Sequence, residues 1–281
     1  MSTLVAQLTG PVQSWGSEPR LRTASTHPTP TWSGLLGLAR AALGHGRTDP
    51  AEQIAWLRGL DMAVRVDAPG TPHVDFHTIN PLPPAYDKFA FLDPGDRGLV
   101  PMGTQVQKSG QAPRWLKGTA PMVTRRHLLH DASFLWLTSG SEVHISRLAE
   151  ALVAPRWALA LGRKNCTPVS PLLLGIHPGD VLEAATSVPR TGSPRRGARG
   201  GQEAGTVRLV WVHGTAHPSL PQQNPRVVLD QPLGSHPQDG YAAGQHTITG
   251  IPAPATSDLL AWAVQHLSHP ARHQPTGQGH S

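Results

Sequence analysis

Residues 1–44 predict a strand, a polar loop and a helix in direct succession, and this unit limits the folds open to the chain. Leu4–Leu8 is a short apolar run that suits a buried strand. It gives way to a loop over Thr9–Gly16 that begins with a Gly-Pro turn. Apolar residues then recur at helical spacing over Gly34–Leu43. We therefore expect a sheet with helices packed against it.

The start and end of this helix carry residues that helix termini prefer. Thr31 or Ser33 can cap its first turn, and Gly44 can end it in a left-handed conformation. A helix that begins near the end of a strand presents unpaired backbone N–H groups and the positive end of its dipole. Phosphates and other anions bind at such places, so we expect an anion near Ser33.

Apolar periodicity and capping residues predict further elements along the chain. They are a short helix over Ala51–Arg58, strands over Asp61–Val66, Ala132–Leu137, Leu172–Leu174 and Val207–Val212, a helix over Arg147–Val153 capped by Ser146, and a last helix over Asp258–Leu267 capped by Ser257. The order strand, helix, strand, strand, helix, strand indicates an α+β sandwich of the ferredoxin-like type. We expect the sequence after Val207 to extend the sheet or to form a small subdomain.

Proline interrupts the segment between Phe76 and Leu128 so often that no regular helix fits over most of it. The segment is too long for an ordinary connection, so it is either functional or ordered by a partner. Residues 99–128 contain no Asp or Glu, but they contain the cations Lys108, Arg114, Lys117, Arg125 and Arg126. We expect an extended basic arm here, and a merely solvated loop is the alternative.

The charge balance favours a polyanionic partner. The 281 residues include 24 Lys and Arg against 18 Asp and Glu, which gives a formal net charge of +6, and only 15% of the chain is charged. Positive charge attracts nucleic acids, although it can also merely aid solubility. The single cysteine, Cys166, excludes a disulfide framework and is typical of a reducing compartment. Because we find no secretory signal and no apolar run of bilayer length, we expect a cytoplasmic protein without a membrane partner.

A second basic turn is predicted around Gly162. This glycine permits the left-handed backbone of a tight turn that exposes successive N–H groups. Arg163 and Lys164 add two cations, and Asn165 adds a neutral donor. Such a turn can hold phosphates, and a surface hairpin that happens to be basic is the alternative.

We expect one domain over residues 1–250. It includes the arm at about residues 78–128 and a flexible basic loop over Arg190–Gly205, which is rich in Gly and Arg. Residues 251–281 are expected to form a C-terminal helix and a disordered tail.

Four tryptophans lie in or beside the polar and basic segments, namely Trp15, Trp32, Trp115 and Trp157. Aromatic faces interleaved with cations suit single-stranded nucleic acid, because unpaired bases stack on them. Tryptophan also fills cores well, and we assign Trp32 and Trp157 to the core. Trp115 lies within the basic arm and is the better stacking candidate.

No signature of a catalytic site is present, since the sequence lacks a P-loop, a Gly-x-Ser-x-Gly elbow and a Gly-x-Gly-x-x-Gly loop. His127-x-x-His130-Asp131 and His266-x-x-His269 have metal-compatible spacing, but we assign the first to structure and the second to the tail. We therefore expect no metal and no cofactor. Cys166 lacks a readable oxyanion partner. A metal-free RNA-cleaving site of His, Lys and Tyr has no fixed spacing and stays open, with Tyr86 and Tyr241 as its tyrosines.

Five short motifs, taken in order, resemble the type I-E branch of the fifth Cas protein family. They are Leu8-Thr-Gly-Pro-Val-Gln-Ser-Trp-Gly16, Pro30-Thr-Trp-Ser-Gly-Leu-Leu-Gly-Leu38, Asp75-Phe-His-Thr78, His130-Asp-Ala-Ser-Phe134, and the segment from Pro155-Arg-Trp through Leu161-Gly-Arg-Lys-Asn-Cys166 to Pro171-Leu-Leu-Leu-Gly175. Each motif is short, whereas five in register over about residues 3–176 make a specific signal. The sequence after Gly175 departs from the family pattern.

The resemblance implies a ferredoxin-like (RRM-related) domain with a protruding thumb, which corresponds to the basic arm between Thr78 and His130. It also implies a non-catalytic subunit of the CRISPR complex Cascade. Such a subunit binds the 5′ handle of the CRISPR RNA and caps the helical backbone subunits beside the large subunit. It meets target DNA only through the assembled complex. Because type I-C relatives cleave RNA, a metal-independent endoribonuclease that processes CRISPR repeat RNA is the alternative.

Under this interpretation, the RNA-binding residues come from the loop, the helix start, the arm and the second turn. They are Gln13, Ser14, Trp15, Arg20, Arg22, Ser33, His77, Lys108, Arg114, Trp115, Lys117, Arg125, Arg126, Arg163, Lys164 and Asn165. Gln13 is expected to read a base edge, and the second turn is expected to clamp the RNA backbone. His77 either bonds RNA or pins the arm to the sheet.

Overall fold

The computed structural model describes residues 1–19, 23–46, 49, 51–79, 104–105, 114–115, 122–169, 171–191, 205–214, 226–232, 241–254 and 258–267. The chain divides into two compact units. The first comprises Met1–Glu18, Ser25–His73 and His127–Ser281, and the second comprises Pro19–Ala24 and Val74–Arg126. The second unit overlaps the stretch in which we expect the basic arm. The division of the chain at residue 250 stays a prediction.

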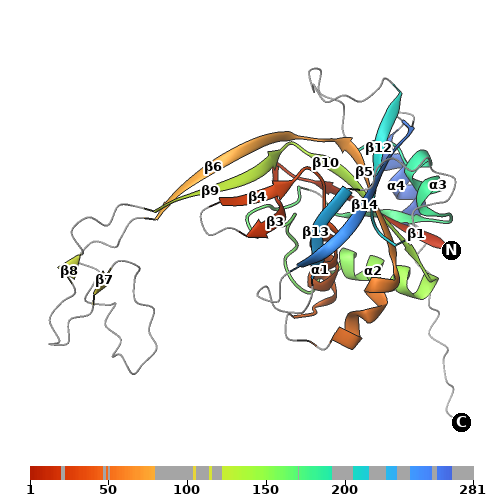
Figure 1. The fold of residues 1–281 in the computed structure, drawn as a ribbon. Coiled ribbons are helices and arrows are strands. Elements are labelled where there is room, and N and C mark those ends of the chain that lie inside the picture. The colour runs from red at the N-terminus through yellow and green to blue at the C-terminus, as the bar shows by residue number, and fades with distance from the viewer. Residues whose placement is uncertain are drawn as a thin grey trace, which may run out of the picture. The chain divides into compact units, whose positions relative to one another are not determined.

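The first unit is built on a seven-stranded sheet in which all neighbouring strands are antiparallel (Figure 1). The strand order is β11-β1-β10-β5-β12-β14-β13. The strands are β1 (Ser2–Thr9), β5 (Asp61–Ala68), β10 (Ser133–Gly140), β11 (Leu173–His177), β12 (Thr206–His213), β13 (Arg226–Pro232) and β14 (Tyr241–Pro252). The five strands predicted for this part of the fold are confirmed. The sequence after Val207 extends the sheet, which is one of the two outcomes left open above.

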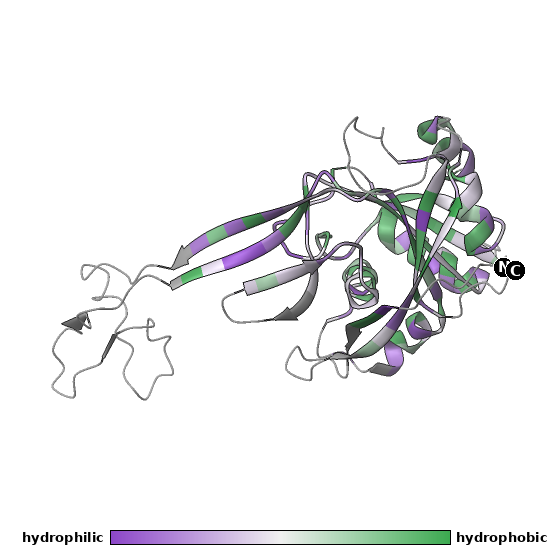
Figure 2. Ribbon diagram, turned by 45° about the horizontal axis from the view of Figure 1, so that its top comes forward, coloured by the Kyte–Doolittle hydropathy of each residue, from purple (hydrophilic) through white to green (hydrophobic). Residues whose placement is uncertain are grey.

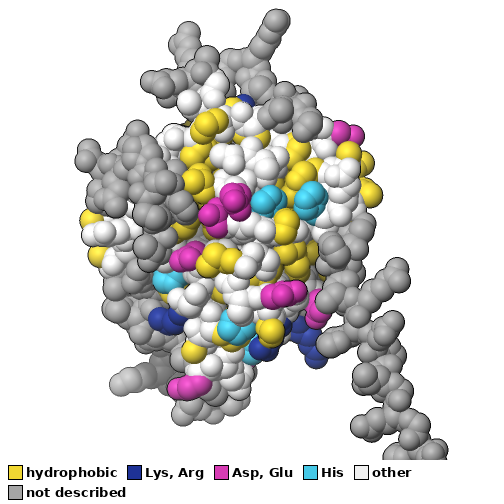
Figure 3. Space-filling model, turned by 90° about the vertical axis from the view of Figure 1, so that its right-hand side faces the viewer, with side chains coloured by type: hydrophobic (Ala, Val, Ile, Leu, Met, Phe, Trp, Pro, Cys, Tyr) yellow, Lys and Arg dark blue, Asp and Glu magenta, His cyan; other side chains and the backbone are white. Residues whose placement is uncertain are grey.

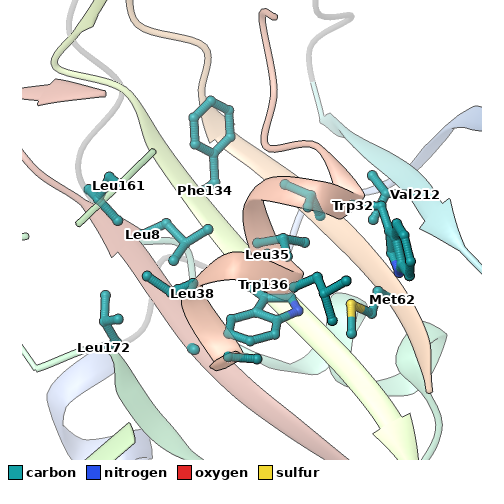
Figure 4. Close-up of a cluster of buried hydrophobic side chains, with 14 of the residues drawn as sticks. Leu8, Trp32, Leu35, Leu38, Met62, Phe134, Trp136, Leu161, Leu172 and Val212 are labelled. Atoms are coloured by element: carbon teal, nitrogen blue, oxygen red, sulfur yellow. The ribbon is translucent and has the colours of Figure 1, made fainter. Parts of the chain in front are cut away.

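Both faces of this sheet are covered, so its central strands carry continuous apolar runs. In β10, Phe134 and Trp136 belong to one core cluster, while Leu135 and Leu137 belong to another. Because successive side chains of a strand point to opposite faces, the two clusters lie on opposite sides of the sheet. Figure 4 shows side chains of the first cluster, among them Phe134 and Trp136.

Helices cover each face. Helix α1 (Trp32–Leu43) and helix α2 (Glu142–Val153) bury their apolar sides in the first cluster. Helix α3 (Val181–Ser187) and helix α4 (Leu259–Leu267) pack against the second. Figure 2 shows hydrophobic residues along the strands and on the helices beside them. The α+β class predicted from the sequence is confirmed.

The helix ends follow the capping rules, with one correction. Thr31 caps α1 because its hydroxyl accepts a hydrogen bond from the N–H of Gly34 (3.3 Å). Gly44 ends α1 with φ of 81°, as predicted. Helix α2 begins at Glu142 and not at Arg147, because Ser141 provides the N-cap instead of Ser146.

Three further elements differ from the prediction. The short helix expected from Ala51 is a 3₁₀-helix, η1 (Ala51–Gly59). Helix α3 is absent from the predicted elements, although its capping box of Asp180 and Glu183 is readable in the sequence. Asp258 caps α4 by accepting hydrogen bonds from two N–H groups of its first turn, and Ser257 lies outside the described residues. No helix in the described ranges is long and apolar enough to cross a membrane.

A second sheet has the strand order β2-β9-β4-β3, with β6 also paired to β9. Its strands are β2 (Val12–Gln13), β3 (Trp15–Pro19), β4 (Thr23–His27), β6 (Thr71–Ile79) and β9 (Met122–His130), and a separate short pair consists of β7 (Thr104–Gln105) and β8 (Arg114–Trp115). The exclusion of regular helix from Phe76 to Leu128 is confirmed for the described residues, which form strands, although the sequence analysis did not predict these strands. These strands are compatible with the prolines of the segment, because Pro81 comes after the end of β6 and Pro121 before the start of β9.

Candidate nucleic-acid interface

The loop Thr9–Gly16 and the turn around Gly162 lie against each other in the first unit. The N–H of Ser14 donates a hydrogen bond to the carbonyl of Leu161 (3.0 Å). The N–H of Val169 donates to the carbonyl of Thr9 (3.1 Å). The approach is so close that a Cβ added to Gly162 would lie 1.6 Å from the carbonyl oxygen of Ser14. Two segments that the sequence singles out separately therefore form one structure.

We call Leu161–Cys166 the basic turn. Its ends are joined by a hydrogen bond from the N–H of Leu161 to the carbonyl of Cys166 (2.7 Å). Inside it, the N–H of Cys166 donates to the carbonyl of Arg163 (2.8 Å). Gly162 has φ of 95°, which is the left-handed conformation predicted for it. The backbone of the turn is thus fixed both internally and by the neighbouring loop.

The side chains of the basic turn differ in exposure. Those of Lys164 and Asn165 are exposed, and that of Arg163 is half-buried. Cys166 is buried, and this burial raises the pKa of its thiol, although a backbone hydrogen bond at Arg163 and the charge of that residue oppose the rise. A buried thiol that stays protonated is a poor nucleophile. The turn therefore presents donors and cations to solvent and keeps its sulfur inside.

The loop side chains expected to contact RNA are buried instead. The amide nitrogen of Gln13 donates to the carbonyls of Leu8 (2.9 Å) and Ala132 (2.8 Å). The amide oxygen of Gln13 accepts a hydrogen bond from the indole N–H of Trp15 (3.1 Å). Gln13 and Trp15 have no exposed surface, and Ser14 has almost none. The expected base contact of Gln13 is corrected, because both hydrogens of its amide bind backbone and hold the loop in shape.

Trp15 also places the loop against the first turn of α1. A Cβ added to Gly34 would lie 2.8 Å from the indole ring of Trp15. Ser33 is partly exposed in this turn, and its hydroxyl lies 3.3 Å from that of Thr31. The first turn of α1 contains no acidic residue, so no side chain of that turn neutralises the positive end of the helix dipole. The loop, the basic turn and the start of α1 are thus linked by direct contacts, and we call them the candidate anion site.

The two tryptophans assigned to the core differ. Trp32 is buried, as predicted, and its ring stacks on His213 with centroids 4.5 Å apart. The guanidinium of Arg58 lies 5.7 Å from the centre of the same ring. Trp157 is 46% exposed, so its assignment to the core is wrong. The reason is that its backbone N–H caps α1 at the carbonyl of Ala41 (3.2 Å), which leaves the ring near the surface.

In the second unit, His77 lies on β6 next to Asp75. Nε2 of His77 and Oδ2 of Asp75 are 2.5 Å apart, and both side chains are nearly half exposed. Arg125 and Arg126 are exposed on β9, and the guanidinium of Arg125 lies 5.7 Å from the centre of the Phe76 ring. These side chains are accessible to a ligand, and their contacts with RNA stay predictions.

Arg20, Arg22, Lys108 and Lys117 lie outside the described residues, and Arg114 and Trp115 form β8 without described side chains. Within the described ranges, no group of three or more His, Cys, Asp or Glu side chains is arranged to hold a metal ion.

The sequence reasoning missed a buried polar network at the start of the predicted flexible loop. Arg65 makes two hydrogen bonds to Asp67 (2.7 and 3.0 Å) and donates to carbonyls at the end of α3. Asp67 also accepts hydrogen bonds from the N–H and the hydroxyl of Thr191 (2.7 and 2.6 Å). The sequence did contain a signal for it, because Arg65 and Asp67 are two residues apart and therefore lie on the same face of a strand. The network fixes the point at which the chain enters the 190–205 segment.

Known proteins resemble this chain over most of its length. The sequence profile of the family described as CRISPR-associated protein (Cas_Cas5) matches residues 3–238. The CRISPR system Cascade subunit CasD of Escherichia coli (strain K12) is 33% identical over 185 residues, which cover 62% of this chain and 70% of CasD.

Solved structures share the fold. A chain from a CRISPR RNA-guided surveillance complex superposes with a TM-score of 0.63 and 27% identity, covering 95% of this chain and 100% of its own length. A chain from a crystal structure of a Cas protein gives a TM-score of 0.58 and 26% identity, covering 91% of this chain and 100% of its own length.

Proposed function

We propose a function from one premise: this chain belongs to the Cas5 family of CRISPR-associated proteins. We infer that it is a non-catalytic subunit of a Cascade surveillance complex and works in the cytoplasm. In this role it binds the 5′ handle of the CRISPR RNA and caps the backbone subunits beside the large subunit. Its similarity to CasD and to a chain of a CRISPR RNA-guided surveillance complex supports the place in the assembly.

The topology supports a ferredoxin-like, RRM-related core within the larger sheet. The elements β1, α1, β5, β10, α2 and β11 follow the order β-α-β-β-α-β. Their four strands are neighbours in the order β11-β1-β10-β5, so the first and third strands are central. Helices α1 and α2 cover the same face. Strands β12, β13 and β14 are additional to this core.

The contact between the loop Thr9–Gly16 and the basic turn carries the proposal. Lys164 supplies an exposed charge and Asn165 an exposed amide donor, on a backbone fixed by hydrogen bonds. A fixed backbone loses little conformational entropy when it binds a phosphate. We infer that the basic turn holds the RNA backbone and that the exposed arginines of β9 add further phosphate contacts.

Replacing Arg163 and Lys164 together by alanine should weaken binding of a short 5′-handle RNA and flatten its salt dependence. Each phosphate contact to a single strand contributes about 0.7 to the slope of log K against log salt, so two lost contacts lower it by about 1.4. Fluorescence anisotropy titrations at several salt concentrations measure both quantities. The double variant Arg147→Ala, Arg226→Ala is the matched control, because it removes the same charge from exposed positions on α2 and β13. If the slope of log K against log salt is unchanged in the Arg163→Ala, Lys164→Ala variant, the basic turn does not contact the RNA phosphates.

The exposed pair of Asp75 and His77 favours a second candidate, a metal-independent endoribonuclease that processes CRISPR repeat RNA. A carboxylate that is hydrogen-bonded to an imidazole can orient the imidazole as a general base. Incubating the purified protein with a repeat hairpin in EDTA separates the two functions. Cleavage that His77→Ala abolishes supports the nuclease, and intact RNA supports the non-catalytic subunit.

A further inference from the structure

Helix α4 exposes a stripe of apolar side chains. Leu260, Val264 and Leu267 are 72%, 59% and 43% exposed. Their spacing of four and then three residues puts them on one side of the helix. Exposed apolar residues that occur singly are ordinary, whereas a contiguous group marks an interaction surface. We call these three residues the α4 stripe.

The opposite side of α4 anchors the helix. Ala263 is buried in the second core cluster, and Leu259 and Trp262 pack against that cluster. His266 lies against Gly175 of β11, where an added Cβ would approach the Cβ of His266 to 2.7 Å. The α4 stripe is therefore not what attaches the helix to the sheet, and its apolar character has another cause.

The sequence of α4 is unlike that of an ordinary surface helix. Leu259–Leu267 contains no Asp, Glu, Lys or Arg, and its only polar side chains are those of Gln265 and His266. A surface helix normally carries charged or polar residues on its outer side, and a helix that is apolar all round is buried. The exposed side of α4 thus lacks the charged residues that the outer side of a surface helix normally carries.

Among the described residues, the charges beside α3 and α4 are negative. Asp258 precedes α4, and Asp180 precedes α3 (Val181–Ser187), which packs on the same core cluster as α4. Asp180 and Glu183 of α3 act electrostatically on His177, as does His266 of α4. Neither α3 nor α4 contains Lys or Arg. Figure 3 shows acidic side chains beside histidines near the middle of this face, with Lys and Arg toward its edges. The described part of this face thus differs in sign from the chain as a whole, whose net charge is +6.

We propose that the α4 stripe docks a neighbouring protein subunit whose contact surface is apolar at its centre and carries Lys or Arg at its rim. The inference rests on the proposed function, since it requires a multi-subunit assembly. RNA is a poor occupant because Asp258, Asp180 and Glu183, on the same side of the sheet as the stripe, would repel its phosphates. A second copy of this chain is also a poor occupant, because a two-fold contact would bring the same negative charges together.

A thiol placed in the stripe tests whether assembly covers it. The native Cys166 is buried, so a maleimide should label full-length Val264→Cys at residue 264 alone. In the isolated protein, labelling should be as fast as that of Val143→Cys, whose position on α2 is 75% exposed. Reconstitution with the partner subunits and CRISPR RNA should slow labelling of Val264→Cys about tenfold or more. Slow labelling in the isolated protein, or equally fast labelling in the complex, overturns the proposal.

Substitutions of opposite charge test the nature of the partner. Leu260→Lys should weaken incorporation into the complex about tenfold more than Leu260→Glu, because the added positive charge faces a basic rim. Equal effects or the reverse order overturn the proposal. The proposal is also overturned if the wild-type protein forms a dimer and Leu260→Lys abolishes that dimer, because the occupant of the stripe would then be a second copy of the chain.

Handle binding separates this inference from the proposed function. Both Leu260 variants, as isolated proteins, should bind 5′-handle RNA as the wild type does. A wild-type protein that binds no handle RNA and joins no complex contradicts the proposed function itself. A wild-type protein that assembles while Leu260→Lys assembles equally well contradicts only the docking surface.

Discussion

Gly162 lies where the basic turn meets the loop Thr9–Gly16, and at the residue scale it explains how these two segments are joined. Its φ of 95° lies in the left-handed region, and a Cβ there would overlap the carbonyl oxygen of Ser14. Any side chain at this position has to push the turn away from the loop. The backbone contact with Ser14 is therefore sufficient to require a glycine at this position.

Gly162→Ala should accordingly reduce stability and RNA affinity together. The strained backbone and the overlap with Ser14 are expected to lower the free energy of unfolding by about 2–4 kcal/mol. Chemical denaturation measures this loss, and anisotropy measures the affinity. Gly37→Ala is the control. Gly37 lies in the middle of α1 on its exposed side, and nothing lies within 4 Å of an added Cβ. This substitution should raise the free energy of unfolding by about 0.5–1 kcal/mol. A Gly162→Ala protein as stable as the wild type would contradict the close contact.

The sequence predicted where the backbone turns better than it predicted which side chains are buried. Gly44 and Gly162 were assigned their left-handed roles from local sequence alone, and both adopt positive φ. Gln13 reads as a polar loop residue, yet the carbonyl of Ala132, far along the chain, supplies one of its partners. Trp157 reads as a core residue, yet it is displaced toward solvent by a backbone contact with α1. Such outcomes depend on long-range contacts that no local pattern records.

At the scale of secondary-structure elements, α4 and β11 meet through histidines. His266 of α4 stacks on Trp262 with ring centroids 3.9 Å apart and lies parallel to His177 of β11 at 6.3 Å. Burial lowers the pKa of His177, and the nearby His266 lowers it further, while Glu183 and Asp180 oppose the shift. The folded protein therefore favours the neutral form of His177.

Stability should consequently fall as the pH drops below about 6.5, the ordinary pKa of histidine. Below that pH the unfolded chain binds a proton that the folded protein excludes, so the contribution of His177 is fully present above 6.5 and is lost on acidification. Thermal unfolding between about pH 8 and pH 5 measures the effect. His177→Gln, whose amide can still pair with the hydroxyl of Ser187, should lose less stability over this range than the wild type. If the stability of both proteins falls equally with pH, the attribution of this pH dependence to His177 is wrong.

Elements with strong local signals were predicted, and those defined by pairing or by length were not. The apolar residues at helical spacing and the capping residues of α1 lie within one short segment, so the predicted bounds of this helix were nearly right. Helix α3 has seven residues, too few for a clear periodicity. Strands β6 and β9 border a proline-rich segment, and their pairing joins residues far apart in the sequence. The strand order of the sheet is likewise a property of long-range contacts.

At the scale of the whole molecule, the first unit has two surfaces of opposite character on opposite sides of its large sheet. Leu161 and Cys166 of the basic turn belong to the first core cluster, whereas Ala263 of α4 belongs to the second. The sheet therefore separates the candidate anion site from the apolar and acidic face of α4. Under the proposed function, this separation leaves RNA and a protein partner different surfaces, so that both could bind at the same time.

RNA and partner subunits should therefore protect different segments from hydrogen exchange. At a free concentration of handle RNA 100 times its Kd, binding adds about 2.7 kcal/mol, and exchange through opening of the contacted segments should slow about 100-fold. We expect this protection in the basic turn and β9, and protection of α4 only after the partner subunits are added. In the Arg163→Ala, Lys164→Ala variant, the turn should lose its protection while α4 keeps its own. Mass spectrometry of the three states gives these patterns, and protection of α4 by RNA alone would show that the two surfaces are not separate.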